Sequence, residues 1–332
     1  MQIGMIGSGS WATALTKILT DNGQTVHWWV RNESYIKHIQ LRHHNPHYLS
    51  AAYFDTNKLI LSTDIQSVIK AAEVLVVAVP SAYIIEAVKE LPADIFANKK
   101  IISAIKGVIP STNQLLNEYL SEQFNFNADN YFTVLGPCHA EEVAAEKLSY
   151  LTFSGTDETM AKTLADFFKT DYLNTVTNND IAGVQYAAIL KNIYALGAGI
   201  AHGLEYGDNF LSVYIANSAN EMVGFLKKLP QTSQSGTINY AASVYLGDLL
   251  VTCYSLFSRN RTFGNMIGKG YSVQAAQLEM NMVAEGYNAS KCMHRINQTI
   301  QADMPIATTI YEILWKNLQA EAGFKKIETY LA

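Results

Sequence analysis

The chain contains 332 residues, of which 49% are hydrophobic and 16% are charged, and its formal net charge is −5. This length predicts two domains of about 100–200 residues each, and the composition excludes an intrinsically disordered chain. The excess of acidic over basic residues argues against a nucleic-acid-binding protein. The longest apolar run, 74–79, is far shorter than the ~20 residues of a membrane-spanning helix, so we expect no membrane insertion.

The cysteines and the start of the chain bear on the cellular compartment. Cys138, Cys253 and Cys292 are odd in number and widely spaced, so they suggest neither a disulfide framework nor a Cys-x-x-Cys metal site. The first residues lack the basic start and apolar core of a signal peptide. We therefore expect a cytoplasmic protein.

Short apolar strands alternate with helical patterns in the first half of the chain. Strands separated by helices of about 10–15 residues predict an α/β fold, with a Rossmann-like, doubly wound, mostly parallel sheet. Helices are expected at 11–22 and 33–41 and from near 64, 81 and 113, and the polar segment 42–58 is expected to be a loop. We predict strands at 3–6, 25–30, 59–61, 74–79, 100–104 and 131–135, with two weaker ones at 148–154 and 171–176.

The second half of the chain has an all-helical pattern. Its long apolar segments contain few β-branched runs, and helices are predicted at 180–202, 209–228, 236–254 and 274–284, with two more between 305 and 332. A polar turn around 177–180 marks the change of pattern. We therefore expect a dinucleotide-binding domain over 1–178 and a helical substrate and catalytic domain over 179–332.

A glycine-rich segment follows the first predicted strand and opens the first helix. In Gly7-Ser8-Gly9-Ser10-Trp11-Ala12, Gly7 permits a tight turn and Gly9 lets the backbone approach a pyrophosphate at the helix N-terminus. Ala12 replaces the third glycine of the dinucleotide-binding fingerprint. The alternative is a glycine-rich turn without a ligand. The strand–turn–helix context favours the dinucleotide.

The end of the second strand bears on the choice of nucleotide. NAD-binding sites usually carry an acidic residue there, but this chain has Arg31, whose cation could meet a 2′-phosphate. Glu33 follows and could still reach the ribose. We predict a preference for NADPH over NADH.

Two other motifs resemble ligand-binding motifs but lack the spacing or the residues that those motifs require. The segment from Gly264 to Gly270 has only three residues between its first two glycines and no Ser or Thr after Lys269, so it is not a phosphate-binding P-loop. His43, His44 and His47 lack a nearby carboxylate pair or helical spacing. We expect a polar loop there and no metal site.

Lys191 lies in a predicted helix among apolar neighbours. At helical spacing its neighbours are Val184, Ala187, Ala188, Tyr194, Ala195 and Ala198. Burial lowers the pKa of a lysine, which suits a general acid or base near neutral pH. The alternative is a lysine that extends to the surface or serves an ion pair.

A polar cluster follows in the same half. Asp248 and Thr252 share one helix face, and the segment from Ser258 to Gly264 contains Arg259 and Asn260. A carboxylate followed by a compact Arg, Asn and Ser group suits a small anionic substrate, with Asp248 orienting Lys191 and Arg259 holding a phosphate. The alternative is a solvated turn or a helix C-cap.

The ordered set of motifs resembles the bacterial NAD(P)-dependent sn-glycerol-3-phosphate dehydrogenases over nearly the whole chain. The loops 105–107 and 135–142 follow predicted strands, where ligands bind in such sheets. The matching motifs are GSGSWATAL at 7–15, VPS at 79–81, IKG at 105–107, GPCHAEE at 136–142, LKN at 190–192, LGDLLVTC at 246–253, SRNRTFG at 258–264 and AEGY at 284–287.

The resemblance implies roles for individual residues. Lys191 matches the family's proton-transfer lysine, and Asp248 would position it. The positions that match the family's substrate contacts are Lys106, Gly136, Cys138, Lys191, Asn192, Asp248, Ser258, Arg259 and Asn260. With the two glycines of the first loop, the implied cofactor positions are Gly7, Gly9, Ser10, Trp11, Arg31, Lys106, Ala140, Arg259, Val283 and Glu285.

The chain departs from the family pattern at three places. Cys138 stands where Ser or Thr is usual, and His139 stands where Phe is common. Ser243-Val244-Tyr245 precedes Leu246-Gly247-Asp248, where the family usually has Ala-Gly-x-Gly-Asp. These changes leave Lys191 and Asp248 in place.

The implied reaction is hydride transfer between NAD(P)H and dihydroxyacetone phosphate, which gives sn-glycerol 3-phosphate for phospholipid synthesis. The expected partners are a small phosphorylated substrate and a second copy of the chain in a homodimer. Two alternatives remain: an NAD(P)-dependent 3-hydroxy acid dehydrogenase of the same architecture, and a dinucleotide-binding redox sensor without turnover.

Overall fold

The computed structural model describes residues 1–230, 238–280 and 284–332, which form two compact units. The first unit comprises Met1–Ile105 and Gln114–Ile181, and the second comprises Lys106–Asn113 and Ala182–Ala332. The sequence predicts that Lys106–Asn113 belongs to the first domain. In the structure this segment packs with the helical unit instead. Its residues Val108 and Ile109 are buried there.

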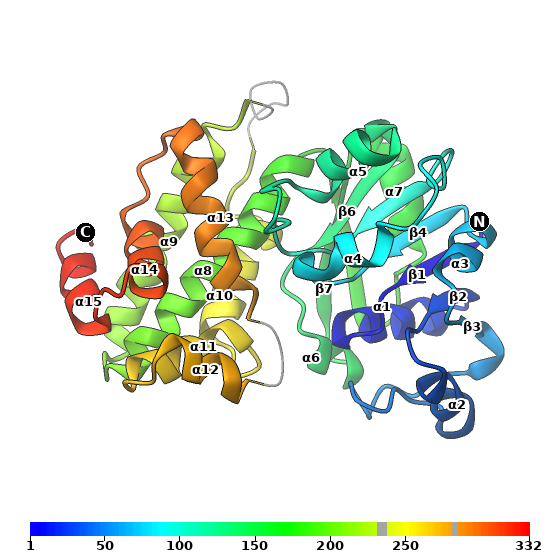
Figure 1. Ribbon diagram of the computed structural model, residues 1–332, viewed down its shortest axis with the longest axis horizontal. Helices are drawn as coiled ribbons and strands as arrows, with labels where there is room; N and C mark the ends of the chain where they lie inside the picture. The colour runs from blue at the N-terminus through cyan, green and yellow to red at the C-terminus, as the bar shows by residue number, and fades with distance from the viewer. Residues whose placement is uncertain (231–237, 281–283) are drawn as a thin grey trace. The chain divides into compact units, whose positions relative to one another are not determined.

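The first unit contains one eight-stranded sheet in the order β3-β2-β1-β4-β5-β6-β7-β8. Figure 1 labels six of these strands, β1 to β4, β6 and β7, in the blue-to-green part of the ribbon. All eight expected strands are confirmed, and the antiparallel pairing of β7 with β6 makes the sheet mostly parallel. The bounds are β1 Ile3–Ile6, β2 Val26–Trp29, β3 Leu59–Ser62, β4 Val74–Val77, β5 Lys100–Ser103, β6 Tyr131–Leu135, β7 Ser149–Gly155 and β8 Leu173–Asn178.

The strand order places a topological switch point at the first strand. β1 pairs with β2 on one side, in the register Ile3 with Val26, and with β4 on the other, in the register Ile3 with Val74. Every residue of β1 and β4 is buried, which explains their continuous apolar sequences. Ligands of such sheets bind beyond the carboxyl ends of the strands at this point.

Helices connect the strands of the first unit. They are α1 Ser10–Asp21, α2 Glu33–Arg42, α3 Ile65–Ala71, α4 Ile84–Val88, α5 Leu116–Phe124, α6 Ala140–Ala144 and α7 Glu158–Asp166. α1 is buried along most of its length although it contains three threonines. The hydroxyls of Thr13, Thr16 and Thr20 donate to the carbonyls of Gly9, Ala12 and Thr16. These bonds satisfy the polar groups, so the helix can pack against the sheet.

The second unit is helical, as expected. Its helices are α8 Ile181–Gly203, α9 Asp208–Leu226, α10 Asp248–Tyr254, α11 Arg259–Gly268, α12 Val273–Glu279, α13 Glu285–Ile300, α14 Pro305–Trp315 and α15 Ala320–Glu328. Among the residues that the structure describes, no helix combines the length and hydropathy of a membrane span.

Two helices of this unit are shorter in the structure than the sequence predicts. The helix predicted at 236–254 is confirmed only from Ser243, where a π-helical turn, Ser243–Gly247, leads into α10; Ala242 before it is extended, with ψ 156°. Residues 236 and 237 lie outside the described ranges. The helix predicted at 274–284 ends at Glu279, because Met280 is extended with ψ 118°, and residues 281–283 of the prediction lie outside the described ranges. In both segments apolar residues also occur outside the helix, so the apolar pattern alone does not mark where the helix begins or ends.

Glycines allow α8 and α11 to cross at very short range. A Cβ atom on Gly264 would lie 1.9 Å from the carbonyl oxygen of Leu196, and one on Gly199 would lie 2.0 Å from that of Arg261. Gly264 and Gly268 are the first glycines of the segment that resembled a P-loop. Their function in this fold is to bring two helix backbones together.

This crossing predicts a large difference between two glycine substitutions. Gly264→Ala forces the two backbones apart and should destabilise the protein by about 2 kcal/mol or more. Gly224, in α9, has open space around its Cβ position, so Gly224→Ala should leave stability unchanged or raise it by up to about 1 kcal/mol. Urea unfolding of both variants measures the difference, and equal stabilities would contradict the packing described.

Candidate active site

The glycine-rich loop between β1 and α1 has the geometry of an anion site. Gly7 has φ +123°, and a Cβ there would lie 2.7 Å from the carbonyl oxygen of Ala78, so only glycine fits. Around the Cβ position of Gly9 there is open space within 4 Å. Gly9 is the N-cap of α1 and supplies no side-chain cap. The first turn of α1 therefore presents backbone N–H groups that can bind a phosphate.

Two side chains that sequence analysis missed fix the shape of this loop. The indole Nε1 of Trp28 donates to the carbonyl of Gly7 at 2.7 Å. Asn45 is fully buried, and its Nδ2 donates to the carbonyl of Ser8 at 3.2 Å and to the Thr13 hydroxyl at 3.0 Å. Nothing in the polar segment around Asn45 distinguishes it from its neighbours, so the sequence carries no usable signal for this role.

The end of β2 presents charges of both signs. Arg31 and Glu33 are exposed, and Asn32 between them caps α2 by accepting from the backbone N–H of Ser34 at 3.0 Å. This arrangement places Arg31 beyond the strand, as expected for a residue that contacts the ribose end of a nucleotide. It places Glu33 beside it, so both sequence-based interpretations of the nucleotide stay open on geometry.

The histidine-rich segment forms ring contacts. The His38 and His44 rings lie 4.8 Å apart edge to face, and His43 stacks on Tyr53 at 5.1 Å. In the described ranges, no three His, Cys, Asp or Glu side chains are placed to hold a metal ion.

The loop between β6 and α6 carries the other expected residues of the first unit. Gly136 has φ +139°, and a Cβ there would lie 3.0 Å from the carbonyl oxygen of Tyr150. Cys138 is buried, His139 is the N-cap of α6, and Ala140 is its first residue. Because β1 and β6 run in the same direction, this loop and the glycine-rich loop lie at the same edge of the sheet.

Lys191 lies in the middle of α8 and is 4% exposed. Its Nζ donates to Oδ1 of Asp248, the first residue of α10, which is 1% exposed. The structure therefore confirms the expected burial of the lysine and its pairing with Asp248. The second carboxylate oxygen, Oδ2 of Asp248, is buried and accepts no hydrogen bond from any described residue.

Burial lowers the pKa of Lys191 from 10.5 to about 8, because the ammonium loses its water. Asp248 acts in the opposite sense by attraction and hydrogen bonding, whereas the positive charge of Lys106 lowers the pKa of Lys191 further. Burial also raises the pKa of the nearby Cys253 thiol to about 12. The thiol therefore stays neutral, whereas Lys191 is suited to exchange a proton near neutral pH.

A chain of hydrogen bonds joins three predicted substrate-binding residues of the second unit, Lys106, Asn192 and Asn260, to Gly286. Asn192, next to Lys191, donates from Nδ2 to the carbonyl of Lys106 at 3.1 Å and accepts on Oδ1 from Asn260 at 2.9 Å. Asn260 in turn accepts from the backbone N–H of Gly286 at 2.9 Å. This chain holds Lys106, α8, α11 and α13 together around the lysine.

The cluster from Ser258 to Asn260 forms the N-terminus of α11. The Ser258 hydroxyl accepts from the backbone N–H of Arg261 at 3.3 Å and caps the helix, and Arg259 is its half-buried first residue. The helix C-cap and solvated turn considered from the sequence are therefore wrong. A helix N-terminus with an adjacent guanidinium favours an anion.

The last expected cofactor positions lie near α13. Glu285 is its first residue and is partly exposed. Val283 lies outside the described residues. α11 and α13 are not predicted from the sequence, because both are polar on average and lack the long apolar segments on which the helix predictions rest.

Comparison with known proteins identifies the family. The family description "NAD-dependent glycerol-3-phosphate dehydrogenase N-terminus" matches residues 2–161, and the corresponding C-terminus matches residues 180–325. A glycerol-3-phosphate dehydrogenase (NAD(P)+) of Enterococcus faecalis is 31% identical over 98% of this chain and 95% of its own length. One of Oceanobacillus iheyensis is 32% identical over 95% and 90%.

A solved structure agrees with this result. The crystal structure of glycerol-3-phosphate dehydrogenase from Coxiella burnetii covers 98% of both chains, with a TM-score of 0.89 and 25% sequence identity. The Saccharomyces cerevisiae enzyme shares the fold, with a TM-score of 0.80 at 23% identity. The chain belongs to the NAD-dependent glycerol-3-phosphate dehydrogenase family.

Proposed function

We propose that Lys191 exchanges the proton in the interconversion of dihydroxyacetone phosphate and sn-glycerol 3-phosphate, with NAD(P)H as the hydride donor. The observation that carries this proposal is the buried Lys191–Asp248 pair. Burial of this ammonium is costly and lowers its pKa to about 8, which suits a group that exchanges a proton near neutral pH.

The first unit fits the nucleotide. The open space at Gly9, the close backbone approach at Gly7 and the uncapped N-terminus of α1 suit a pyrophosphate. Ser10 and Trp11 follow on the first turn, and the resemblance adds Arg31, Lys106, Ala140, Arg259, Val283 and Glu285. When bound, the nicotinamide supplies or accepts the hydride at its C4 atom.

The N-terminus of α11 fits the substrate phosphate. Arg259 supplies a guanidinium, Ser258 and Asn260 supply polar side chains, and the helix dipole adds positive potential. The resemblance adds Lys106, Gly136, Cys138 and Asn192 as substrate contacts. Binding the phosphate fixes the position of the carbonyl carbon that reacts.

Lys191 and Asp248 carry the proton chemistry. With a pKa of about 8, Lys191 is mostly protonated at neutral pH and donates its proton as the substrate carbonyl becomes an alkoxide. The reverse reaction requires the neutral amine. Oδ1 of Asp248 orients the amine. Oδ2 is buried and can accept a hydrogen bond from a substrate hydroxyl, which would satisfy it.

The phosphate site distinguishes this function from that of a 3-hydroxy acid dehydrogenase. Removal of the substrate's phosphate removes charge-assisted bonds, so kcat/KM with dihydroxyacetone should be roughly 10³-fold lower than with dihydroxyacetone phosphate. The absorbance of the reduced nicotinamide measures both rates. Equal rates would contradict the proposal. A complete lack of cofactor oxidation with ketone phosphates would favour a redox sensor, although a sensor needs no buried lysine.

The nucleotide preference is the second part of the proposal. Arg31 is exposed at the end of β2 and can meet a 2′-phosphate, so NADPH should give a higher kcat/KM than NADH in the same assay. Equal efficiency with the two nucleotides, or a preference for NADH, would contradict this prediction.

We also propose that this reaction supplies glycerol phosphate for phospholipid synthesis in the cytoplasm, and that the chain acts as a homodimer. The family membership supports the pathway.

A further inference from the structure

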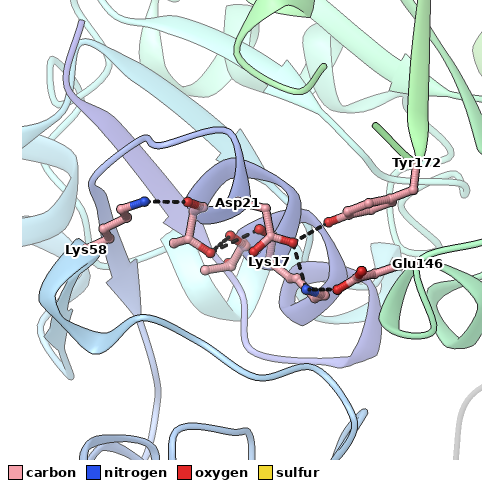
Figure 2. Close-up of polar contacts among 7 residues, drawn as sticks. Lys17, Asp21, Lys58, Glu146 and Tyr172 are labelled. Carbon is pink, nitrogen blue, oxygen red and sulfur yellow. Dashed lines mark hydrogen bonds and ion pairs between the residues drawn. The ribbon is translucent and has the colours of Figure 1, made fainter. Parts of the chain in front are cut away.

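An ion pair joins two helices of the first unit near their C-terminal ends. Lys17 is 5% exposed in the second half of α1, and its Nζ lies 2.7 Å from Oδ2 of Asp21 and 3.0 Å from Oε1 of Glu146 (Figure 2). Asp21 belongs to the same helix, whereas Glu146 follows the last turn of α6. The Glu146 bond is therefore the one that connects the two helices.

The backbone at Glu146 is left-handed, a conformation that nine described non-glycine residues adopt, Glu205 and Gln301 among them. The N–H of Glu146 donates to the carbonyl of Val143, and the N–H of Lys147 donates to that of Glu142, both at 2.9 Å. These two bonds form a Schellman motif at the end of α6, and Glu146 occupies the left-handed position with φ +53°. Glycine is favoured there, because a side chain strains the left-handed conformation. The chain keeps a glutamate instead, and its carboxylate contacts Lys17.

The remaining contacts keep Lys17 charged and hold α1 in place. Burial opposes the ammonium, but Asp21 and Glu146 outweigh it and raise the pKa of Lys17. The hydroxyl of Tyr172, just before β8, donates to Oδ2 of Asp21 at 2.6 Å (Figure 2). The carboxylate of Asp21 therefore bridges Lys17 and Tyr172. The second half of α1 is thus fixed against both α6 and the antiparallel end of the sheet.

The other ends of the same two helices carry the nucleotide loops. α1 begins after the glycine-rich loop at the end of β1, and α6 begins after the Gly136–His139 loop at the end of β6. In the sheet, β4 and β5 separate β1 from β6, so the two loops are about 14 Å apart at the usual strand spacing. α6 is a single turn of five residues that packs directly against α1, so Glu146 lies only about 10 Å from the loop that precedes α6, and a shift at its end displaces that loop.

We propose that Lys17 and Glu146 are positioning residues for the nucleotide: their bond fixes the spacing between the loop at the N-terminus of α1 and the loop at the N-terminus of α6. This inference rests on the proposed nucleotide site. The ion pair acts through the two helices and does not touch the ligand. The feature that distinguishes Glu146 is its contact with the buried Lys17 of another helix, since a half-exposed pair by itself contributes little to stability.

The variant Glu146→Gly separates positioning from stability. It removes the carboxylate and relieves the left-handed strain, so the unfolding temperature should equal or exceed that of the wild type. The Kd for NADPH, measured by titration of nicotinamide fluorescence without substrate, should rise about two- to fivefold, because the pair can transmit no more free energy to binding than it contributes, which is up to roughly 1 kcal/mol. Glu146→Gln, which keeps a side chain at this position, should raise the Kd similarly, and kcat at saturating NADPH should stay near the wild-type value for both.

A matched control breaks an ion pair elsewhere in the same unit. Glu86 pairs with Lys89 on α4 at 2.9 Å, so Glu86→Gln removes the same charge and should leave the Kd for NADPH unchanged. Wild-type affinity in Glu146→Gly and Glu146→Gln would overturn this inference alone. A wild-type protein that binds neither NADPH nor NADH would instead contradict the proposed function.

Discussion

The site depends on one buried ion pair, Lys191 with Asp248. An isolated ammonium in the core of the helical unit would lose its proton, whereas a carboxylate in direct contact keeps it charged near neutral pH. Burial and pairing act against each other, and the balance lowers the pKa of Lys191 to about 8. The same burial that makes the lysine costly to the fold therefore makes it useful as an acid or base.

The helical unit is built around that pair. Glycine contacts bring α11 against α8, which places Arg259 and Ser258 at a helix N-terminus in the unit that holds Lys191. The Asn192–Asn260 bond then ties these helices to the carbonyl of Lys106 and to α13. Buried amides that are fully bonded specify one arrangement of the helices, because any other arrangement leaves polar groups unsatisfied.

Sequence patterns predicted the parts of the fold that depend on local residues. The sequence predicts the central strands because parallel strands that are buried on both faces have continuous apolar runs. It predicts the burial of Lys191 because the helical neighbours of this lysine are apolar. Other features depend on contacts with distant residues. They are the burial of Asn45, the packing of Lys106–Asn113 with the helical unit, and the helix α11. No periodicity in the sequence carries that information, since it arises only from tertiary packing.

Turnover of Lys191→Ala tests the central claim most directly. We expect kcat with dihydroxyacetone phosphate to fall at least about 10²-fold, with the Kd for NADPH unchanged and with partial recovery when ethylamine is added. Lys227→Ala, which removes an exposed lysine at the end of α9, should keep wild-type turnover. Near-normal turnover of Lys191→Ala without added amine would remove this lysine from the mechanism.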